Sequence, residues 1–401
     1  MKILAIETSC DETAVAVVES RGNLDAPSFS ALSNVVHSQI EVHKEYGGVF
    51  PNLAKREHSK NLVPVLEKAL SEGFGNSKNQ IPDSKQIPNN QKHQIEKIFE
   101  REPELLKQFL ERIPQVAKPE IDALAVTSGP GLEPALWVGI NFAKALSLVW
   151  QTPVVAINHM EGHIASVLLA QNKIDFPALA LLISGGHTEL VAASNWKNYR
   201  LIGKTRDDAV GEAFDKAARI LGLPYPGGPE ISALAKKSRD RNKTKIQNSK
   251  SQTNSKIKLP RPMINSQEAD FSFSGLKTAV LYLVRNLGGL EKIDAETKQE
   301  IAREFEDAVV DILLAKTKKA IEGERFQTLI VGGGVSANKR IRESLAELAR
   351  SKGLAFRLSA PELSTDNAVM IALAGFIEIE KRGLPEISER DKIKAEGNLT
   401  L

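Results

Sequence analysis

Two histidines stand one helical turn apart in the segment His159-Met160-Glu161-Gly162-His163. At this i and i+4 spacing both imidazoles lie on one face of a helix and can reach one divalent metal ion. The segment is not a zincin motif, because Met160 stands where that motif has a glutamate. Histidine pairs on helices are more often surface or core residues than ligands, and a complete site needs a third ligand that the pair does not identify.

A turn rich in carboxylates and hydroxyls, Glu7–Thr13, lies between two β-rich runs. If the turn faces a cleft, Asp11 or Glu12 could act as a base or position an amine; if it faces solvent, it is a polar turn. Cys10 is the only cysteine of the chain, which excludes an internal disulfide framework and a cysteine-cluster metal site. The neighbouring acids disfavour its thiolate and argue against a nucleophilic role.

Two glycine-rich segments could bind a phosphate or a nucleotide. Ser184–His187 holds two glycines between strand-like runs, and glycines let backbone N–H groups face an anion without interference from a Cβ. An ordinary tight turn is the alternative there. Val331–Asn338 holds three glycines after a predicted strand, with Ser336 placed to cap the next helix and Asn338 placed to supply hydrogen-bond donors.

Standard nucleotide-binding and hydrolase motifs are missing. Asn198 replaces the first glycine of a P-loop ahead of Gly203-Lys204-Thr205. Pro134 replaces the third glycine of a Rossmann fingerprint, and no G-x-S-x-G nucleophile elbow occurs. P-loop hydrolysis and dinucleotide redox chemistry are therefore disfavoured.

The chain has 401 residues, of which 42% are hydrophobic and 26% charged, a globular composition that suits two or three domains. No apolar run reaches the roughly 18–20 residues that span a bilayer, so we expect a cytoplasmic protein with no membrane segment. The net charge is +3, yet Lys236–Arg261 contains ten Lys or Arg residues and one acid, Asp240. Such a stretch could contact a polyanion or form a solvated surface loop.

Strand-like and helical segments alternate along the chain, and a hairpin followed by helices occurs twice. This pattern predicts two similar α/β lobes with a cleft between them. The predicted strands are Ile3–Glu7, Ala14–Glu19, Leu124–Thr127, Val154–Ile157, Ala178–Ser184, Thr188–Ala193 and Thr328–Val331. The predicted helices are Pro134–Trp150, Asp207–Leu221, Gly275–Asn286 and Ala295–Gly323, with others beginning at His159, Ser336 and Asp366.

Two stretches, Gly73–Asn90 and Lys236–Lys258, lack core periodicity, and we expect both to be surface insertions that are dispensable for chemistry. The segment after the first stretch, Gln91–Ile113, predicts short amphipathic helices broken at Pro103.

A set of motifs runs in a fixed order over nearly the whole chain, outside the two insertions and about the last twenty residues. They are Ile6–Thr13, Gly47–Pro51, Ser128–Leu132, His159–His163, Leu182–Thr188, Gly211–Lys216, Tyr225–Pro229, Phe271–Lys277, Gly333–Asn338 and Thr365–Asn367. This ordered set closely resembles the bacterial and organellar tRNA adenosine threonylcarbamoyltransferases, a family of the actin/Hsp70/sugar-kinase (ribonuclease H-like) fold group.

The resemblance implies an acyltransferase. The family transfers the threonylcarbamoyl group from L-threonylcarbamoyl-AMP to the exocyclic N6 amine of the adenosine beside the tRNA anticodon, and AMP leaves. It also implies a first lobe of residues 1–153 plus 366–401, with an insertion at about 73–118. The second lobe would be residues 154–365, with the Lys-rich insertion at about 236–258, and the final helix would pack on the first lobe.

The resemblance also implies site residues. The metal ligands would be His159, His163 and Asp366, holding iron(II) as in the family, although two imidazoles and a carboxylate suit zinc too. Asp11 and Glu12 would handle the adenosine amine. The acyl-adenylate would be bound by Leu182, Ile183, Ser184, Gly185, Gly186, Asp215, Gly228 and Asn338.

The expected partners are tRNA, L-threonylcarbamoyl-AMP, a paralogous subunit of the same fold and a small ATPase, with no membrane. One alternative is a non-catalytic scaffold paralogue, but such relatives lack the histidine pair and the later acid. Another is an ATPase or sugar kinase of the same superfamily, which would carry an Asp-Gly pair near the first hairpin instead of Ser9-Cys10-Asp11-Glu12. A metallopeptidase ranks last, because no glutamate follows His159.

Overall fold

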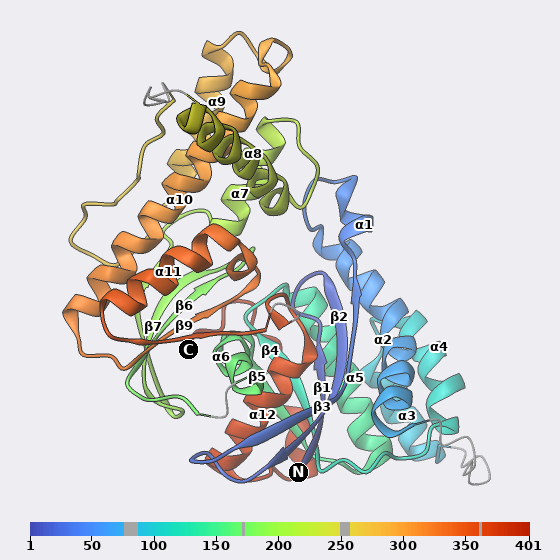
Figure 1. The fold of residues 1–401 in the computed structure, drawn as a ribbon. Coiled ribbons are helices and arrows are strands. Elements are labelled where there is room, and N and C mark those ends of the chain that lie inside the picture. Colours follow the sequence, from blue (N-terminus) through green and yellow to red (C-terminus); the bar gives the residue numbers. More distant parts are fainter. Residues whose placement is uncertain (76–86, 171–172, 249–256, 361–362) are drawn as a thin grey trace. The chain divides into compact units, whose positions relative to one another are not determined.

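The computed structural model describes residues 1–75, 87–170, 173–248, 257–360 and 363–401, and within 243–248 the backbone only (Figure 1). The chain divides into two compact units. The first unit comprises Met1–Val42, Val49–Ile174 and Ser359–Leu401, and the second comprises His43–Gly48 and Asp175–Leu358. None of the helices in the described ranges is long and apolar enough to cross a membrane.

The first unit is built on a five-stranded sheet with the order β3-β2-β1-β4-β5. β1 (Lys2–Glu7) pairs antiparallel with β2 (Glu12–Arg21), and β2 pairs antiparallel with β3 (Ser28–Ser38). β4 (Ala123–Gly129) runs parallel to β1, and β5 (Val154–Asn158) runs parallel to β4. The predicted hairpin and parallel strands are confirmed; β3 escaped prediction because its polar, half-exposed residues hide the strand period.

Helices cover both faces of this sheet. α2 (Pro51–Phe74) and α5 (Glu133–Trp150) pack on one face, where they bury Leu4 and Leu124. α12 (Ala368–Arg382) packs on the other face, and Gly375 there lies against Ala125 and Ile3. Burial on both faces explains why β1 reads as a nearly continuous apolar run. The final helix therefore packs on the first unit, as predicted.

The segment after the first insertion belongs to the core. α3 (Asn89–Ile98) and α4 (Pro103–Arg112) form as predicted, with Pro103 in the first turn of the second helix. The prediction of a surface insertion at 73–118 is wrong for this part, because apolar side chains of both helices are fully buried in the first unit's core. Residues 76–86, which make up most of the predicted insertion Gly73–Asn90, lie outside the described residues. The buried side chains are Ile95, Phe99, Leu105, Phe109 and Ile113.

The second unit repeats the same sheet topology with the order β10-β9-β6-β7-β8. Its first three strands form an antiparallel meander, the fourth pairs parallel with the first, and the fifth pairs parallel with the fourth. The strands are β6 (Ala178–Ile183), β7 (Thr188–Asn195), β8 (Asn198–Lys204), β9 (Thr328–Gly332) and β10 (Ala355–Leu358). The helices are α7 (Val210–Ile220), α8 (Gly227–Asn248), α9 (Ser274–Asn286), α10 (Ala295–Gly323) and α11 (Lys339–Ser351).

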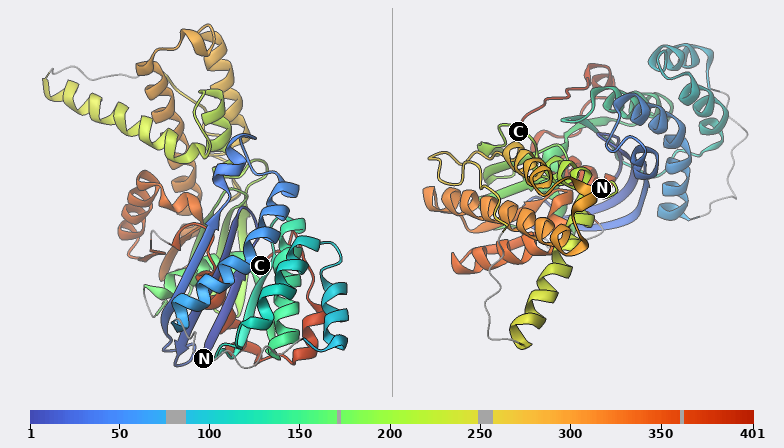
Figure 2. Two further views of the ribbon diagram at one scale, coloured as in Figure 1. Left: turned by 90° about the vertical axis from the view of Figure 1, so that its right-hand side faces the viewer. Right: turned by 90° about the horizontal axis from the view of Figure 1, so that it is seen from above.

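The Lys-rich stretch begins as a helix rather than as a loop. α8 continues to Asn248 and packs against α10 (Figure 2). Arg239 on α8 forms ion pairs with Glu306 and Asp307 of α10, at 2.5 and 2.6 Å. This part of the stretch is therefore anchored by charge, which apolar periodicity did not reveal. Residues 249–256 lie outside the described residues.

The boundaries between the units differ from the lobes drawn from the resemblance. Residues 154–174 and 359–365, expected in the second lobe, group with the first unit. The physical reason is strand pairing: β5 hydrogen-bonds to β4, and the helix that follows it, α6 (His159–Ala165), packs on α12.

Candidate metal centre

Three parallel strands bring the site residues to one edge of the first sheet. Glu7 ends β1, Thr127 lies near the end of β4, and β5 leads directly into α6. The carboxyl ends of parallel strands are where open α/β sheets place their ligands. The side chain of Asn158 accepts a hydrogen bond from the Met160 amide at 2.8 Å and so caps the start of α6.

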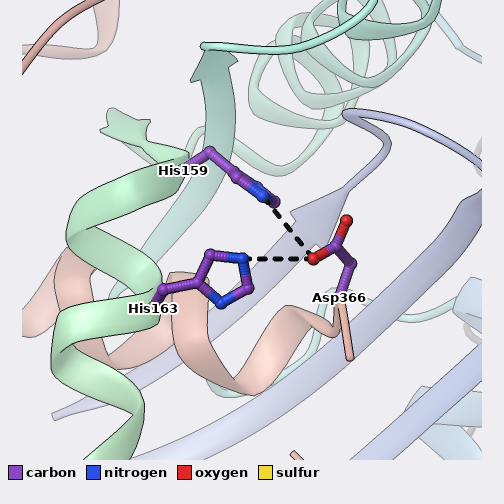
Figure 3. A group of neighbouring side chains, drawn as sticks. All are labelled: His159, His163 and Asp366. Atoms are coloured by element: carbon purple, nitrogen blue, oxygen red, sulfur yellow. Dashed lines mark ion pairs between the residues drawn. The ribbon is translucent and has the colours of Figure 1, made fainter. Parts of the chain in front are cut away.

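The two predicted histidines and Asp366 converge (Figure 3). The Oδ1 atom of Asp366 lies 3.5 Å from His159 Nε2 and 3.2 Å from His163 Nε2. One ligand atom from each residue lies within 4.8 Å of the other two. All three residues belong to the first unit, so the expectation that the ligands combine two lobes is corrected. Asp366 reaches the histidines because the chain returns to this unit before α12.

The donor set fits a metal ion. The Nδ1 atom of His163 is buried without a hydrogen-bond partner, and its Nε2 lies 3.2 Å from Asp366 without hydrogen-bond geometry. Buried nitrogens of this kind are costly unless another ligand satisfies them. Two imidazoles and one carboxylate suit iron or zinc. Gly162 gives the helix room here, because a Cβ at this position would lie 3.0 Å from Ile371 Cδ1 on α12.

Glu7 contacts His159 on the side of the ring away from Asp366. Its side chain is fully buried, and its Oε2 lies 3.1 Å from His159 Nδ1 and accepts a 2.6 Å hydrogen bond from Thr127. Burial would raise the pKa of Glu7, but the charge and hydrogen bond of His159 lower it. Burial would lower the pKa of His159, but the Asp366 and Glu7 carboxylates raise it to about 9. The sequence analysis did not single out Glu7, since its place at the end of β1 was the only available signal.

Glu12 and Cys10 lie close enough to Asp366 for its negative charge to affect their pKa values. Burial, with Asp11 and Asp366 beside it, raises the pKa of Glu12 well above its ordinary value. Burial and the same acids also raise the pKa of the Cys10 thiol, consistent with the weak nucleophile expected from the sequence.

The loop that carries these acids is held by a histidine that the sequence analysis missed. His58 on α2 is fully buried, and its Nε2 lies 3.0 Å from the Cys10 carbonyl oxygen. Its Nδ1 lies 2.8 Å from the Thr13 hydroxyl. His58 therefore joins the two ends of the loop that holds Asp11 and Glu12.

The predicted nucleotide residues all belong to the second unit. The side chains of Leu182 and Ile183 are fully buried in β6, so only their backbone can meet a ligand. Gly185 and Gly186 are exposed at the turn that follows. An added Cβ at either glycine, or at Gly228, would meet no protein atom within 4 Å, so these backbone stretches are open to a ligand.

The side chains of Asp215 and Asn338 are hydrogen-bonded to neighbouring segments of the protein. Asp215 accepts a 2.7 Å hydrogen bond from the Gly227 amide. Asn338 caps α11 through Ile341, and its amide nitrogen lies 2.8 Å from both Ser232 and Glu306. The predicted cap, Ser336, lies instead in the 3-10 turn Gly334–Ala337, and Asn338 has no amide hydrogen left for a nucleotide.

Each unit thus carries a sheet of the same mixed topology, and this doubled arrangement defines the actin/Hsp70/sugar-kinase class of α/β proteins. The family model for tRNA N6-adenosine threonylcarbamoyltransferase (TsaD) matches residues 30–81 and 94–373. The chain belongs to this family.

Two curated relatives with the same family name cover almost the whole chain. The protein of Persephonella marina is 40% identical over 386 residues, which is 96% of this chain and 92% of the relative. The protein of Anaeromyxobacter sp. is 41% identical over 388 residues, which is 96% of this chain and 97% of the relative.

Solved structures resemble the chain more distantly. A HypF protein from T. kodakarensis is 12% identical with a TM-score of 0.49, over 97% of this chain and 48% of that one. The activator of the 2-hydroxyisocaproyl-CoA dehydratase from Clostridium difficile is 11% identical with a TM-score of 0.45, over the full length of both chains.

Proposed function

We propose that this chain is a tRNA-modifying acyltransferase that moves the threonylcarbamoyl group from L-threonylcarbamoyl-AMP to N6 of the adenosine beside the anticodon. The N6–carbon bond forms, the carbon–oxygen bond to the phosphate breaks, and AMP and one proton leave. The convergence of His159, His163 and Asp366, in a chain of this family, is the observation that carries the proposal.

The proposed cofactor is one divalent metal ion, iron(II) by family resemblance, with zinc as the alternative. His159 and His163 would supply neutral nitrogen ligands, and Asp366 a negative oxygen. When bound, the ion would supply positive charge that polarises a carbonyl or phosphate oxygen. Burial of both histidines supports this role, because it keeps the ligands out of bulk water.

The donor would bind through the second unit. Gly185 and Gly186 would present main-chain N–H groups to the adenylate, and Gly228 would leave space for it. Ser184 would hold this turn, since its amide donates to the His187 carbonyl oxygen at 2.9 Å. Asp215 and Asn338 would act by holding the neighbouring segments in place, since both side chains hydrogen-bond to protein atoms.

Asp11 and Glu12 are the proposed proton acceptors for the adenosine amine. The raised pKa of Glu12 supports a carboxyl group that can hold a proton taken from the amine. The tether from His58 to Cys10 would hold this loop still during transfer.

The proposed partners are tRNA, a paralogous subunit of the same fold and a small ATPase, and the proposed compartment is the cytoplasm. The decisive experiment incubates the purified chain with L-threonylcarbamoyl-AMP and unmodified tRNA, with and without the candidate partners. Nucleoside analysis should detect threonylcarbamoyladenosine. Absence of product under every combination would contradict the proposed reaction, whereas product only with the partners would assign them a required role.

A further inference from the structure

Glu7 is a fully buried carboxylate whose charge is not matched by a lysine or arginine among the described residues. Its contacts are the Ser9 amide at one oxygen, and the Thr127 hydroxyl and His159 Nδ1 at the other. A buried carboxylate is costly unless hydrogen bonds and a nearby positive charge offset its desolvation. Its hydrogen bonds offset that cost, and they connect it to a metal-ligand candidate.

The hydrogen-bond chemistry settles which proton His159 carries. An ionised carboxylate only accepts hydrogen bonds, so Nδ1, at 3.1 Å from Glu7 Oε2, must carry the hydrogen. Nε2, which lies toward Asp366 at 3.5 Å, is therefore the nitrogen that must give up its proton to bind a metal ion. The Ser9 hydroxyl, 3.2 Å from the same Nδ1, can accept a share of that hydrogen.

The scaffold behind this contact is rigid. β1 and β4 pair in parallel up to Ile6 and Val126, so Glu7 and Thr127 stand side by side one residue further on. β4 pairs Thr127 with Ile157, two residues before His159. Three paired strands therefore set the distance from the carboxylate to the ring, and no flexible loop intervenes.

His163 offers an internal contrast. Its Nε2 lies toward Asp366, as that of His159 does, but its Nδ1 lacks a hydrogen-bond partner although the ring is as buried as that of His159. The two histidines therefore differ at Nδ1, which faces the Glu7 carboxylate in His159 and no hydrogen-bond partner in His163.

We infer that Glu7 is a positioning residue of the metal centre, which fixes the Nδ1–H tautomer and the ring orientation of His159 and adds a second negative charge beside the ligands. The inference rests on the proposed metal-dependent function. With Asp366 and Glu7 both ionised, a divalent ion would be balanced in charge. Such carboxylate–histidine–metal arrangements raise the basicity of the ligand, and their loss typically weakens metal affinity by about 10–100-fold.

Two variants separate the effect of the position of the Glu7 carboxylate from the effect of its charge. Glu7→Gln keeps the size but offers one acceptor oxygen, while donors face both oxygens of Glu7. Glu7→Asp keeps the charge but is one methylene shorter, so it falls short of His159. The matched control is Glu102→Gln, which removes a carboxylate that is equally buried in the first unit but bound to Lys55 and Asn141.

The first measurement is the Zn²⁺ affinity of each full-length protein, by competition with a chromophoric chelator. We expect both Glu7 variants to bind Zn²⁺ about 10–100-fold more weakly than the wild type, and Glu102→Gln to bind within about twofold of it. Unchanged affinity in both Glu7 variants, or equal weakening in Glu102→Gln, would overturn the inference.

The second measurement reads the tautomer itself, without metal and without activity. Long-range ¹H–¹⁵N spectra of ¹⁵N-histidine-labelled protein, recorded above the raised pKa of His159 of about 9 so that the ring is neutral, should show Nδ1–H in the wild type, with His159 assigned by its absence in His159→Gln. An Nε2–H form in the wild type would overturn the inference. This test needs only the wild-type ring, so it holds even where Glu7→Gln does not fold. A wild-type protein that binds no Zn²⁺ would contradict the metal centre itself, whereas wild-type binding with unaltered Glu7 variants would contradict only the role of Glu7.

Discussion

Asp366 is the charged member of the ligand group, and a single oxygen of its side chain faces both imidazoles. Its side chain is 19% exposed, against 5% and 1% for the two histidines. The carboxylate is therefore the most accessible of the three groups. Glu161, on the same helix as the histidines, lies instead 3.9 Å from Lys381 and is not part of the group.

At the residue scale, the ligand assignment predicts different results for three alanine variants. Asp366→Ala and His159→Ala should each lose bound metal and reduce transfer by about 100-fold or more, since each removes one of three ligands. Glu161→Ala should keep both properties, because it lies off the ligand group. Metal analysis and tRNA nucleoside analysis provide the measurements. Full activity in Asp366→Ala, or equal losses in all three folded variants, would rule out the proposed centre.

At the element scale, a buried ion pair adds to the apolar packing that joins α8, α10 and α11 of the second unit. Glu306 on α10 is 2% exposed, and it binds Arg239 from α8 and Asn338 from the cap of α11. One buried carboxylate thus connects three helices. Arg261, just after the Lys-rich stretch, repeats the pattern with Glu304 and Asp311.

This arrangement predicts that Arg239 contributes to the free energy of unfolding. Arg239→Ala should lower the free energy of unfolding by about 3 kcal/mol, because it leaves the buried Glu306 without its cation. Arg241→Ala, whose partners Glu296 and Glu300 are more exposed, should cost about 1 kcal/mol or less. Urea unfolding followed by circular dichroism measures both. A larger loss in Arg241→Ala would show that burial does not set the cost.

At the scale of the whole molecule, each unit has its own sheet and its own hydrophobic core. All three candidate ligands lie in the first unit. A ligand that binds only the folded state stabilises the part of the protein that must fold to form its site. Metal should therefore affect the two units unequally.

We expect bound metal to raise the free energy of unfolding of the first unit. Metal at about 100 times its dissociation constant should stabilise that unit by about 2.7 kcal/mol, and a chelator should reverse the effect. Hydrogen exchange should show greater protection with metal in β1, β4 and α12, and little change in β6, β7 and β9. Equal protection of both sheets would contradict a site confined to the first unit.

Much of the fold was predictable because it is encoded locally. Apolar runs between glycines and prolines located most strands, and helical periodicity located α5, α9 and α10. The sequence by itself also placed His159 and His163 on one helical face, because their spacing is a property of any α-helix. The ordered motifs, by resemblance, added Asp366 and the family.

Only the tertiary structure decided what depends on contacts between distant segments. Strand pairing, not spacing, put the Glu7 carboxylate against His159, and it assigned β5 and α6 to the first unit. Packing made Phe99 and Phe109 core residues, although the resemblance implied a surface insertion at about 73–118. The hydrogen bond from Asn338 to Glu306 has the same origin. The hydrogen-bond partners of a side chain are its neighbours in space, which local sequence does not encode.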